Sequence, residues 1–249
     1  MHIPTRYALL FLAATLIAPV VAAAQTPPPP PPKQEGSAQI AFVGTTGNTS
    51  TSTFSAGGEY IARPTNWLIK DRLLFINNQT EGVTSANSLL YAMRAERTLT
   101  TRTSAFGDYR YFQDELAGVT HRNDVTGGLA FKLATGPTHT LTVDGGVGYL
   151  NEKRVAGDDV STGTYSAGAA YKWQVSKTSD VTDEFRFLDT FDDSSDWRVG
   201  NIVSVTAKIN EIFALKFSNI VRYSNLPPIG FKTTDTTTSI ALVASFKKQ

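Results

Sequence analysis

The sequence predicts an all-β protein, a closed antiparallel up-and-down transmembrane barrel of about twelve strands. Three observations predict this fold. Apolar and polar residues alternate with a period of two along nearly the whole chain after Gly36, the alternating segments are long enough to cross a bilayer at a tilt, and an export signal precedes them. None of the 249 residues is cysteine. Closure of a large sheet would replace the disulfides that stabilise many small exported proteins.

Residues 1–24 have the organisation of a cleaved secretory signal. A short basic region, His2 to Arg6, precedes the apolar run Ala8–Val21, and three alanines at 22–24 form a small-residue cleavage site. The apolar run is shorter than the roughly 20 residues that a membrane-spanning helix needs. The pattern therefore favours a cleaved signal over a membrane anchor.

Residues 25–36 are predicted to form a proline-rich periplasmic linker. Six consecutive prolines, Pro27–Pro32, cannot join a helix or a sheet and adopt an extended polyproline II spacer. Loss of the signal removes Arg6 and no acidic residue, so the basic side chains fall from 23 to 22 and equal the 22 acidic ones. A chain with this charge balance lacks the basic surface of a nucleic-acid-binding protein, and we expect no nucleic-acid partner.

Residues 37–246 are predicted to form the barrel. In the segment 159–173, for example, Tyr165 and Tyr171 share one face whereas Thr164 and Lys172 share the other. An even number of antiparallel strands is typical of a closed bacterial barrel. With ends placed to within about two to four residues, the expected strands cover residues 37–46, 50–63, 66–77, 87–98, 102–113, 119–132, 138–151, 159–173, 179–190, 197–209, 212–225 and 233–246.

The connections between these strands alternate between two kinds. The short turns are at 64–66, 98–102, 134–138, 174–178 and 210–211. The longer connections, richer in Asp, Asn and Gly, are at 77–87, 114–118, 152–158, 191–196 and 226–232, with a tight turn at Gly47-Asn48 as the exception. Outer-membrane barrels keep short turns in the periplasm and longer loops outside. We therefore expect both ends of the chain in the periplasm.

Aromatic residues on the predicted lipid-facing side fall near both ends of the strands, as the girdles of a membrane barrel do. The predicted girdle residues are Tyr60, Trp67, Tyr111, Phe131, Tyr149, Tyr171, Trp173, Trp197, Phe213, Tyr223 and Phe246. Asp71 and Asp183 also fall on the lipid-facing side, which suits a carboxylate poorly. A β-bulge that turned either residue inward would remove the conflict.

The opposite side of the strands predicts a charged interior. The residues expected to line it include Arg94, Asp108, Arg110, Arg122, Asp124, Asp144, Glu184, Arg186, Arg198, Arg222 and Asp235. These charges either pair across strands and fill the interior, or line a narrow wet pore. About eight strands enclose only side chains and about 16–18 leave a channel, so both arrangements are compatible with twelve strands.

No pattern of catalytic or metal-binding residues emerges from the mature chain. It has two histidines, His121 and His139, and neither has a serine and a carboxylate at a spacing that suggests a triad. Residues 189–196 contain four aspartates, but the glycine and terminal glutamate of an EF-hand loop are missing. We expect no catalytic residues, no cofactor and no metal site.

A series of short motifs runs in order through nearly all of the chain after the prolines. The motifs are residues 45–97, beginning Thr-Thr-Gly-Asn-Thr, followed by 106–108, 124–131, 145–149, 195–198 and 225–228. In this order they resemble an uncharacterised bacterial family of salt-induced outer-membrane proteins (YdiY-like). The resemblance implies an outer-membrane barrel, supplies no established activity, and hints at a response to osmotic or salt conditions.

The C-terminal tail, residues 247–249, departs from many outer-membrane barrels. Those often end in an aromatic residue that the barrel-assembly machinery reads, whereas here Phe246 is followed by Lys247, Lys248 and Gln249. A strictly terminal signal is therefore in doubt. The expected partners are still the barrel-assembly machinery and outer-membrane lipid.

The leading interpretation is an exported barrel in the outer membrane of a Gram-negative bacterium. It would act either as a narrow pore for small polar solutes or ions, or as a structural envelope barrel. The second interpretation is an outer-membrane hydrolase or acyltransferase that acts on lipid, and the third is a soluble periplasmic binding protein. Dependence on detergent and heat-modifiable gel migration would separate a membrane barrel from the soluble alternative.

Overall fold

The structure is a computed structural model that describes residues 31–45 and 51–248. The predicted signal, the first half of the predicted linker (residues 25–30) and the predicted turn at Gly47-Asn48 lie outside these residues. Within the described residues, no helix is long and apolar enough to cross a membrane.

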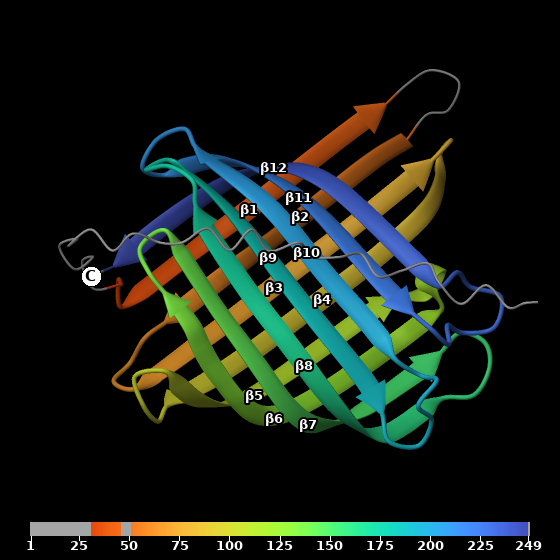
Figure 1. Ribbon diagram of the computed structural model, residues 1–249. Coiled ribbons are helices and arrows are strands. Elements are labelled where there is room, and N and C mark those ends of the chain that lie inside the picture. The colour runs from red at the N-terminus through yellow and green to blue at the C-terminus, as the bar shows by residue number, and fades with distance from the viewer. Residues whose placement is uncertain (1–30, 46–50, 249) are drawn as a thin grey trace, which may run out of the picture. The chain divides into compact units, whose positions relative to one another are not determined.

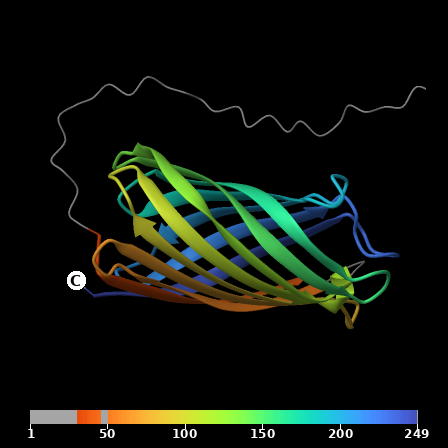
Figure 2. The same ribbon diagram turned by 90° about the horizontal axis from the view of Figure 1, so that it is seen from below.

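Twelve antiparallel strands close into one barrel, which confirms the predicted fold class and strand number. Each strand pairs with its neighbours in the sequence, and β1 completes the ring by pairing with β12. The strands are strongly inclined to the barrel axis (Figures 1 and 2). They are β1 (Gln34–Thr45), β2 (Thr51–Ala62), β3 (Trp67–Thr80), β4 (Val83–Thr98), β5 (Thr103–Asp114), β6 (Val119–Thr135), β7 (His139–Arg154), β8 (Val160–Gln174), β9 (Ser179–Thr190), β10 (Arg198–Lys208), β11 (Phe213–Ser224) and β12 (Thr234–Lys248).

The two ends of the barrel differ in their connections. One end, here called the turn end, carries the start of β1, the end of β12 and the connections 63–66, 99–102, 136–138, 175–178 and 209–212. The other end, here called the loop end, carries the connections 115–118, 155–159, 191–197 and 225–233, the first of which contains the 3-10 helix η1 (Glu115–Ala117). The end of β12 lies beside the start of β1 at the turn end, where Gln34 pairs with Lys248.

The predicted connection at 77–87 is wrong. β3 continues to Thr80 and β4 begins at Val83, so only Glu81 and Gly82 connect the two strands. Both residues have positive φ angles, 53° and 78°, as a two-residue type I′ hairpin turn requires. The polar composition of this stretch resembles a loop and conceals the ends of both strands.

The seam of the barrel extends into the predicted linker and tail. Gln34 pairs with Lys248, so the ladder between β1 and β12 begins before and ends after the predicted limits of the barrel. Just after the neighbouring strand β2, the Arg63 backbone N–H donates to the Lys33 carbonyl oxygen at 2.8 Å, and the Arg63 side chain forms an ion pair with Glu35. These contacts order the chain just before the sheet.

Side chains alternate between the inner and outer faces of the sheet. In β8, Thr162, Thr164 and Ser166 are buried, whereas Tyr165 between them is 41% exposed. In β12, Ala241 and Val243 are buried while Leu242 is 51% exposed. The period-two pattern of the sequence therefore sorts small and polar side chains inward and many large apolar ones outward.

Strands β6 and β7 approach each other closely at a group of glycines. A Cβ atom added to Gly128 would lie 2.1 Å from the Gly145 carbonyl oxygen, and one on Gly148 would lie 2.3 Å from the Val125 carbonyl oxygen. The blocking atoms belong to the backbone of the paired strand, so they cannot rotate away as a side chain can. Only glycine fits at these positions.

Replacement of Gly128 tests this close approach. Gly128→Ala should lower the free energy of unfolding by about 1–3 kcal/mol, because the added methyl group forces the two strands apart. Gly107→Ala on β5 is the matched control, since a Cβ there would meet nothing within 4 Å. Urea titration of the refolded barrel, followed by heat-modifiable gel migration, compares the two. Equal midpoints would contradict the close packing of β6 on β7.

Candidate functional site in the barrel interior

An ion pair crosses the interior of the barrel between opposite walls. Arg72 lies on β3 and Glu184 lies on β9, and five strands separate these two strands in either direction around the ring. The Arg72 guanidinium donates from Nη1 and Nη2 to the two carboxylate oxygens of Glu184, both at 2.7 Å. This bidentate geometry gives a strong, well-oriented contact. The two walls are therefore joined through their side chains.

Arg72 also contacts a carboxylate on the neighbouring strand β2. Its Nε and Nη2 donate to Oε2 of Glu59 at 3.0 and 2.8 Å, and Lys70 Nζ lies 3.7 Å from the same oxygen. We call Glu59, Lys70, Arg72 and Glu184 the transverse cluster. It has two positive and two negative charges, and its side chains are between 25% and 37% exposed. Water therefore reaches the transverse cluster inside the barrel.

A group of apolar side chains closes another part of the interior. Leu74 and Ile76 of β3 form a buried cluster with Ile220 of β11, and Leu90 of β4 and Ile202 of β10 pack against it. Three strands separate β3 from β11 around the ring, so this contact also spans the interior. We call these five residues the apolar cluster. Leu74 and Ile76 follow Arg72 at alternate positions, and this signal could have identified them in the sequence.

Arg186 joins carboxylates on two strands of the polar side of the interior. Its Nη2 donates to Asp124 Oδ2 at 2.6 Å, and its Nη1 lies 3.6 Å from Asp108 Oδ2. Arg110 donates from Nε to Asp108 Oδ1 at 3.1 Å. The Asp108 side chain is only 2% exposed. Its negative charge would be costly in the interior without these cations.

Arg94 forms a second bridge across several strands. Its Nη2 lies 3.4 Å from Asp144 Oδ2 on β7, and its Nε donates to Glu96 Oε1 at 2.7 Å. The guanidinium carbon also lies 3.9 Å from the centre of the Phe106 ring, a distance that suits a cation–π contact. Arg94 on β4 thus connects to β7 across the interior.

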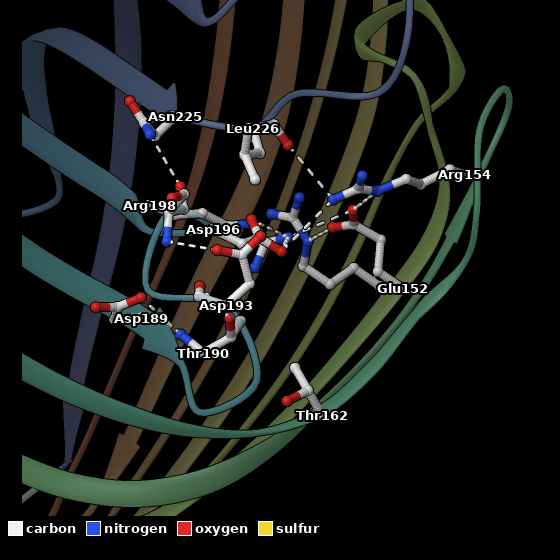
Figure 3. A network of polar contacts seen from close by, with 12 residues as sticks. Glu152, Arg154, Thr162, Asp189, Thr190, Asp193, Asp196, Arg198, Asn225 and Leu226 are labelled. Carbon is white, nitrogen blue, oxygen red and sulfur yellow. Dashed lines mark hydrogen bonds and ion pairs between the residues drawn. The ribbon is translucent and has the colours of Figure 1, made fainter.

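A third group of charges lies near the loop end (Figure 3). The Glu152 side chain is 1% exposed and forms ion pairs with Arg122, with Arg154 at 2.7 Å and with Arg198 at 3.5 Å. Asp196 lies 3.1 Å from Arg198 and 3.7 Å from Arg154. Burial raises the pKa of Asp196, and the two arginines oppose this shift. We call these five residues the loop-end network.

The loop-end network is tied to the connections above it. Arg154 donates through Nη2 to the Leu226 carbonyl oxygen at 3.4 Å and through its backbone N–H to Asp159 Oδ1 at 3.0 Å. Asn225 Nδ2 donates to the Ser195 carbonyl oxygen at 2.9 Å. The connections 155–159, 191–197 and 225–233 border a cavity of about 450 Å³. These contacts hold three loops together over the end of the interior (Figure 3).

Arg222 and Asp235 are not brought together as an ion pair. They are partners in the register of β11 and β12, but Asp235 is exposed, and Arg222 has no ion pair among the described residues. The Arg222 guanidinium carbon instead lies 5.0 Å from the centre of the Phe112 ring, and that of Arg122 lies 5.6 Å from the same ring. Arg94, Arg110, Arg122, Arg186 and Arg198 each have at least one carboxylate partner.

Three members of the loop-end network lie in segments that the sequence analysis predicted to be connections, and they were not expected to line the interior. Glu152 and Arg154 belong to β7, which continues to residue 154, and Asp196 lies just before β10. The alternation that places Asp144 inward continues through Leu150, which is 0% exposed, to Glu152. Continuing that pattern would have identified Glu152 and Arg154. No pattern in the sequence identifies Asp196.

The predicted girdle residues divide between the two ends of the strands. Tyr60, Trp67, Phe131, Tyr171, Trp173, Phe213 and Phe246 lie near the turn end, and Tyr111, Tyr149, Trp197 and Tyr223 lie near the loop end. Seven of the eleven are 38–62% exposed. The remaining four are Tyr111, Tyr171, Trp197 and Tyr223, which are half-buried against neighbours on the same face. Trp197 and Tyr223, for instance, have ring centres 4.9 Å apart.

No bulge turns Asp71 or Asp183 away from the outer face. The register of β3 and of β9 is regular at both positions. Tyr91 donates its hydroxyl to Asp71 Oδ1 at 3.2 Å, and Asn201 Nδ2 donates to Asp183 Oδ1 at 2.6 Å. Each carboxylate thus has a hydrogen-bond donor on the adjacent strand, which the sequence alone did not reveal.

The two histidines of the mature chain lie at opposite ends of the barrel. His121 is near the start of β6 at the loop end, and His139 begins β7 at the turn end. His139 Nδ1 lies 2.7 Å from the Tyr171 hydroxyl, and its ring stacks on Trp173 with centres 6.0 Å apart. Across residues 31–45 and 51–248, no group of three His, Cys, Asp or Glu side chains could hold a metal ion.

Glu152 forms ion pairs with three arginines, which gives a direct test of the loop-end network. Glu152→Gln would leave three arginines around one neutral amide, and we expect the free energy of unfolding to fall by about 3–5 kcal/mol. Glu211→Gln in an exposed turn is the control and should change it by less than about 0.5 kcal/mol. Urea midpoints measure both variants. A Glu152→Gln barrel as stable as the control would show that Glu152 does not organise the network.

Among the solved structures similar to this chain, one supports the fold with a TM-score above 0.5. An outer-membrane channel from Pseudomonas putida F1 is 10% identical, with a TM-score of 0.51 over 91% of this chain and 100% of its own. The NanC porin is 7% identical, with a TM-score of 0.47 over 86% and 99%. The translocator domain of the autotransporter NalP from Neisseria meningitidis is 12% identical, with a TM-score of 0.43 over 86% and 87%. At these identities the likeness concerns the fold alone.

No curated protein matches the chain at a significant level. A family model, however, matches residues 38–246, which include all but the first four residues of β1 and all of β12 except its last two. The chain therefore belongs to the family described as "Protein of unknown function, DUF481".

Proposed function

We propose that this protein is a narrow outer-membrane pore for small polar solutes or ions, closed by its own side chains in the conformation described. The predicted export signal, the even number of antiparallel strands and the aromatic residues near both strand ends support the membrane location. The observation that carries the proposal is the transverse cluster. It joins opposite walls while remaining accessible to water.

The interior is unevenly closed. Side chains of the transverse cluster are 25–37% exposed, whereas those of Glu152, Asp196 and Arg198 in the loop-end network are 1–9% exposed. The side chains of the transverse cluster are therefore less closely packed than those of the loop-end network. A solute would have to displace both groups of ion pairs and pass the apolar cluster.

The chemistry of the interior favours a pore over a purely structural barrel. A buried ion pair is commonly no more stabilising than well-packed apolar side chains of similar volume. The apolar cluster shows that this barrel can fill part of its interior with Leu and Ile. Charged side chains are retained elsewhere in the interior, mostly in pairs of opposite sign. They offer a polar solute hydrogen-bonding partners that an apolar filling would not, which supports a path for polar solutes.

Salt would weaken the ion pairs of the transverse cluster by screening their charges, since these side chains are partly exposed. The Debye length falls from about 10 Å at 0.1 M to about 3 Å at 1 M ionic strength. High salt should thus weaken the Arg72–Glu184 contact more than the buried Glu152 contacts. This difference supports a link to the osmotic or salt response that the resemblance to YdiY-like proteins suggests.

Planar bilayers test the proposed closure. The wild-type barrel should show brief, small conductance steps at low salt. The double variant Arg72→Ala with Glu184→Ala keeps the net charge and removes the contact between the walls, so its mean conductance should rise several-fold. Lys177→Ala with Glu211→Ala removes one charge of each sign from exposed turns and serves as the control.

Two outcomes would contradict the proposal. A wild-type barrel with a large, steady conductance would show that the ion pairs do not close the interior. A silent bilayer for both the wild type and the Arg72/Glu184 variant, with folding verified by heat-modifiable migration, would favour the structural envelope barrel.

A further inference from the structure

Three lysines on neighbouring strands gather around one carboxylate on the inner face of the barrel. They are Lys172 of β8, Lys208 of β10 and Lys216 of β11, and the carboxylate is that of Asp180 on β9. Each is an even number of positions from a buried residue of its own strand, and no bulge interrupts the pairing of these strands. All four side chains therefore point into the interior. We call these residues the lysine group.

The register of the strands places the members of the lysine group beside one another. Asp180 is the register partner of Thr206, and Thr206 is in turn the partner of Lys216. Lys208 lies two positions beyond Thr206, so it is a diagonal neighbour of both Asp180 and Lys216. Diagonal neighbours on one face lie about 7–8 Å apart, which long side chains can span. Lys172 Nζ lies 3.8 Å from Asp180 Oδ1.

The lysine group carries more positive charge than its one carboxylate neutralises. Asp180 forms an ion pair with Lys172, whereas Lys208 and Lys216 form no ion pair with any residue that the structure describes. The two carboxylates of the transverse cluster also act on Lys216, but both are already bound to Arg72. Two ammonium groups thus lack a carboxylate of their own.

The lysine group extends from the rim of the turn end toward the transverse cluster. Lys208 is the last residue of β10 and is exposed, and the Lys172 side chain is 48% exposed. Lys216 is half-buried, three positions from the start of β11. On β9, Asp180 precedes Glu184 of the transverse cluster by four positions. A dissolved ion that enters at the turn end therefore meets the lysine group before it meets the transverse cluster.

The donors of the lysine group suit an anion with several oxygen atoms. An ammonium group has three N–H donors and no acceptor, and it binds phosphate or carboxylate as a point charge. The Thr206 hydroxyl, on the same face between Asp180 and Lys216, can donate a further hydrogen bond. Because the side chains face the interior, the anion would be a dissolved one rather than a lipid headgroup.

The connections at the two ends of the barrel carry opposite charge. The loop-end connections, with the turn at 81–82 included, contain seven acidic residues and one basic residue. The turn-end connections contain three basic residues and one acidic residue. Charges of one sign around an opening raise the local concentration of ions of the other sign. An anion is therefore attracted to the turn end and repelled from the loop end.

We propose that the lysine group is a binding site for a small dissolved oxyanion with at least two negative charges, which enters the barrel from the turn end. Two or more negative charges match the two ammonium groups that lack a carboxylate. The inference gives the proposed pore a class of solute, and it rests on that proposed function only for the passage of the anion. Binding at the lysine group requires no conductance.

Thiol labelling inside the barrel tests the site, because the chain contains no cysteine of its own. Thr206→Cys places a thiol in the middle of the lysine group. A negatively charged methanethiosulfonate reagent should modify it several-fold faster than a positively charged one. Inorganic pyrophosphate, added at constant ionic strength, should slow that reaction. Ser194→Cys in the acidic connection 191–197 is the control and should react faster with the positively charged reagent.

Two double variants in the Thr206→Cys background locate the effect. Lys208→Gln with Lys216→Gln should lower the preference for the negative reagent several-fold and abolish protection by pyrophosphate. Lys153→Gln with Lys232→Gln removes the same charge near the loop end and should leave both unchanged. Heat-modifiable migration verifies the folding of each variant.

Three outcomes would overturn the proposal. They are an equal or faster reaction of the Thr206→Cys thiol with the positive reagent, no reaction with either reagent, and pyrophosphate protection that survives the loss of Lys208 and Lys216. A silent planar bilayer would count against the proposed pore but would leave this measurement unaffected.

Discussion

The Arg72–Glu184 ion pair joins opposite walls of the barrel, and the arrangement of the interior follows from the need to neutralise charges in a narrow closed ring. Inward side chains from strands far apart around the ring meet one another. A cation placed there is costly unless a carboxylate lies nearby. The same need explains why Arg186 reaches Asp124 and why Glu152 holds three arginines.

The strength of this closure changes along the barrel. At the loop end, buried charges are tied to three connections, and Arg154 contacts both the charged network and the Leu226 backbone. The transverse cluster has fewer such supports and is open to water. A change in ionic strength would therefore act first on the transverse cluster. The apolar cluster, which contains no charge, would respond little to salt.

The outer face of the barrel is mainly apolar, in contrast to the charged interior. Most of its exposed large side chains are apolar, such as Phe42, Leu73 and Leu242. Asp71 and Asp183 break this pattern at two opposite places, each supported by a donor on the next strand. A local donor reduces the cost of a carboxylate but leaves part of its capacity unused.

Period-two alternation was sufficient to predict the strand number and the closed ring. It succeeds because the side-chain direction in a strand depends only on position along that strand. Partners across the interior depend on the stagger of the whole ring, which no single segment encodes. The pairing of Arg72 with Glu184 was therefore not predicted. The polar run after Ile76 also hid the continuation of β3, since its composition resembles a loop.

A double-mutant cycle on Arg72 and Glu184 most directly tests whether the opposite walls are joined. The free energies of unfolding would be measured in vesicles for the wild type, Arg72→Met, Glu184→Gln and the double variant. A direct contact predicts a coupling energy of about 0.5–3 kcal/mol that decreases with added salt. Additive effects, with a coupling within about 0.3 kcal/mol of zero, would show that the two walls do not interact through this pair.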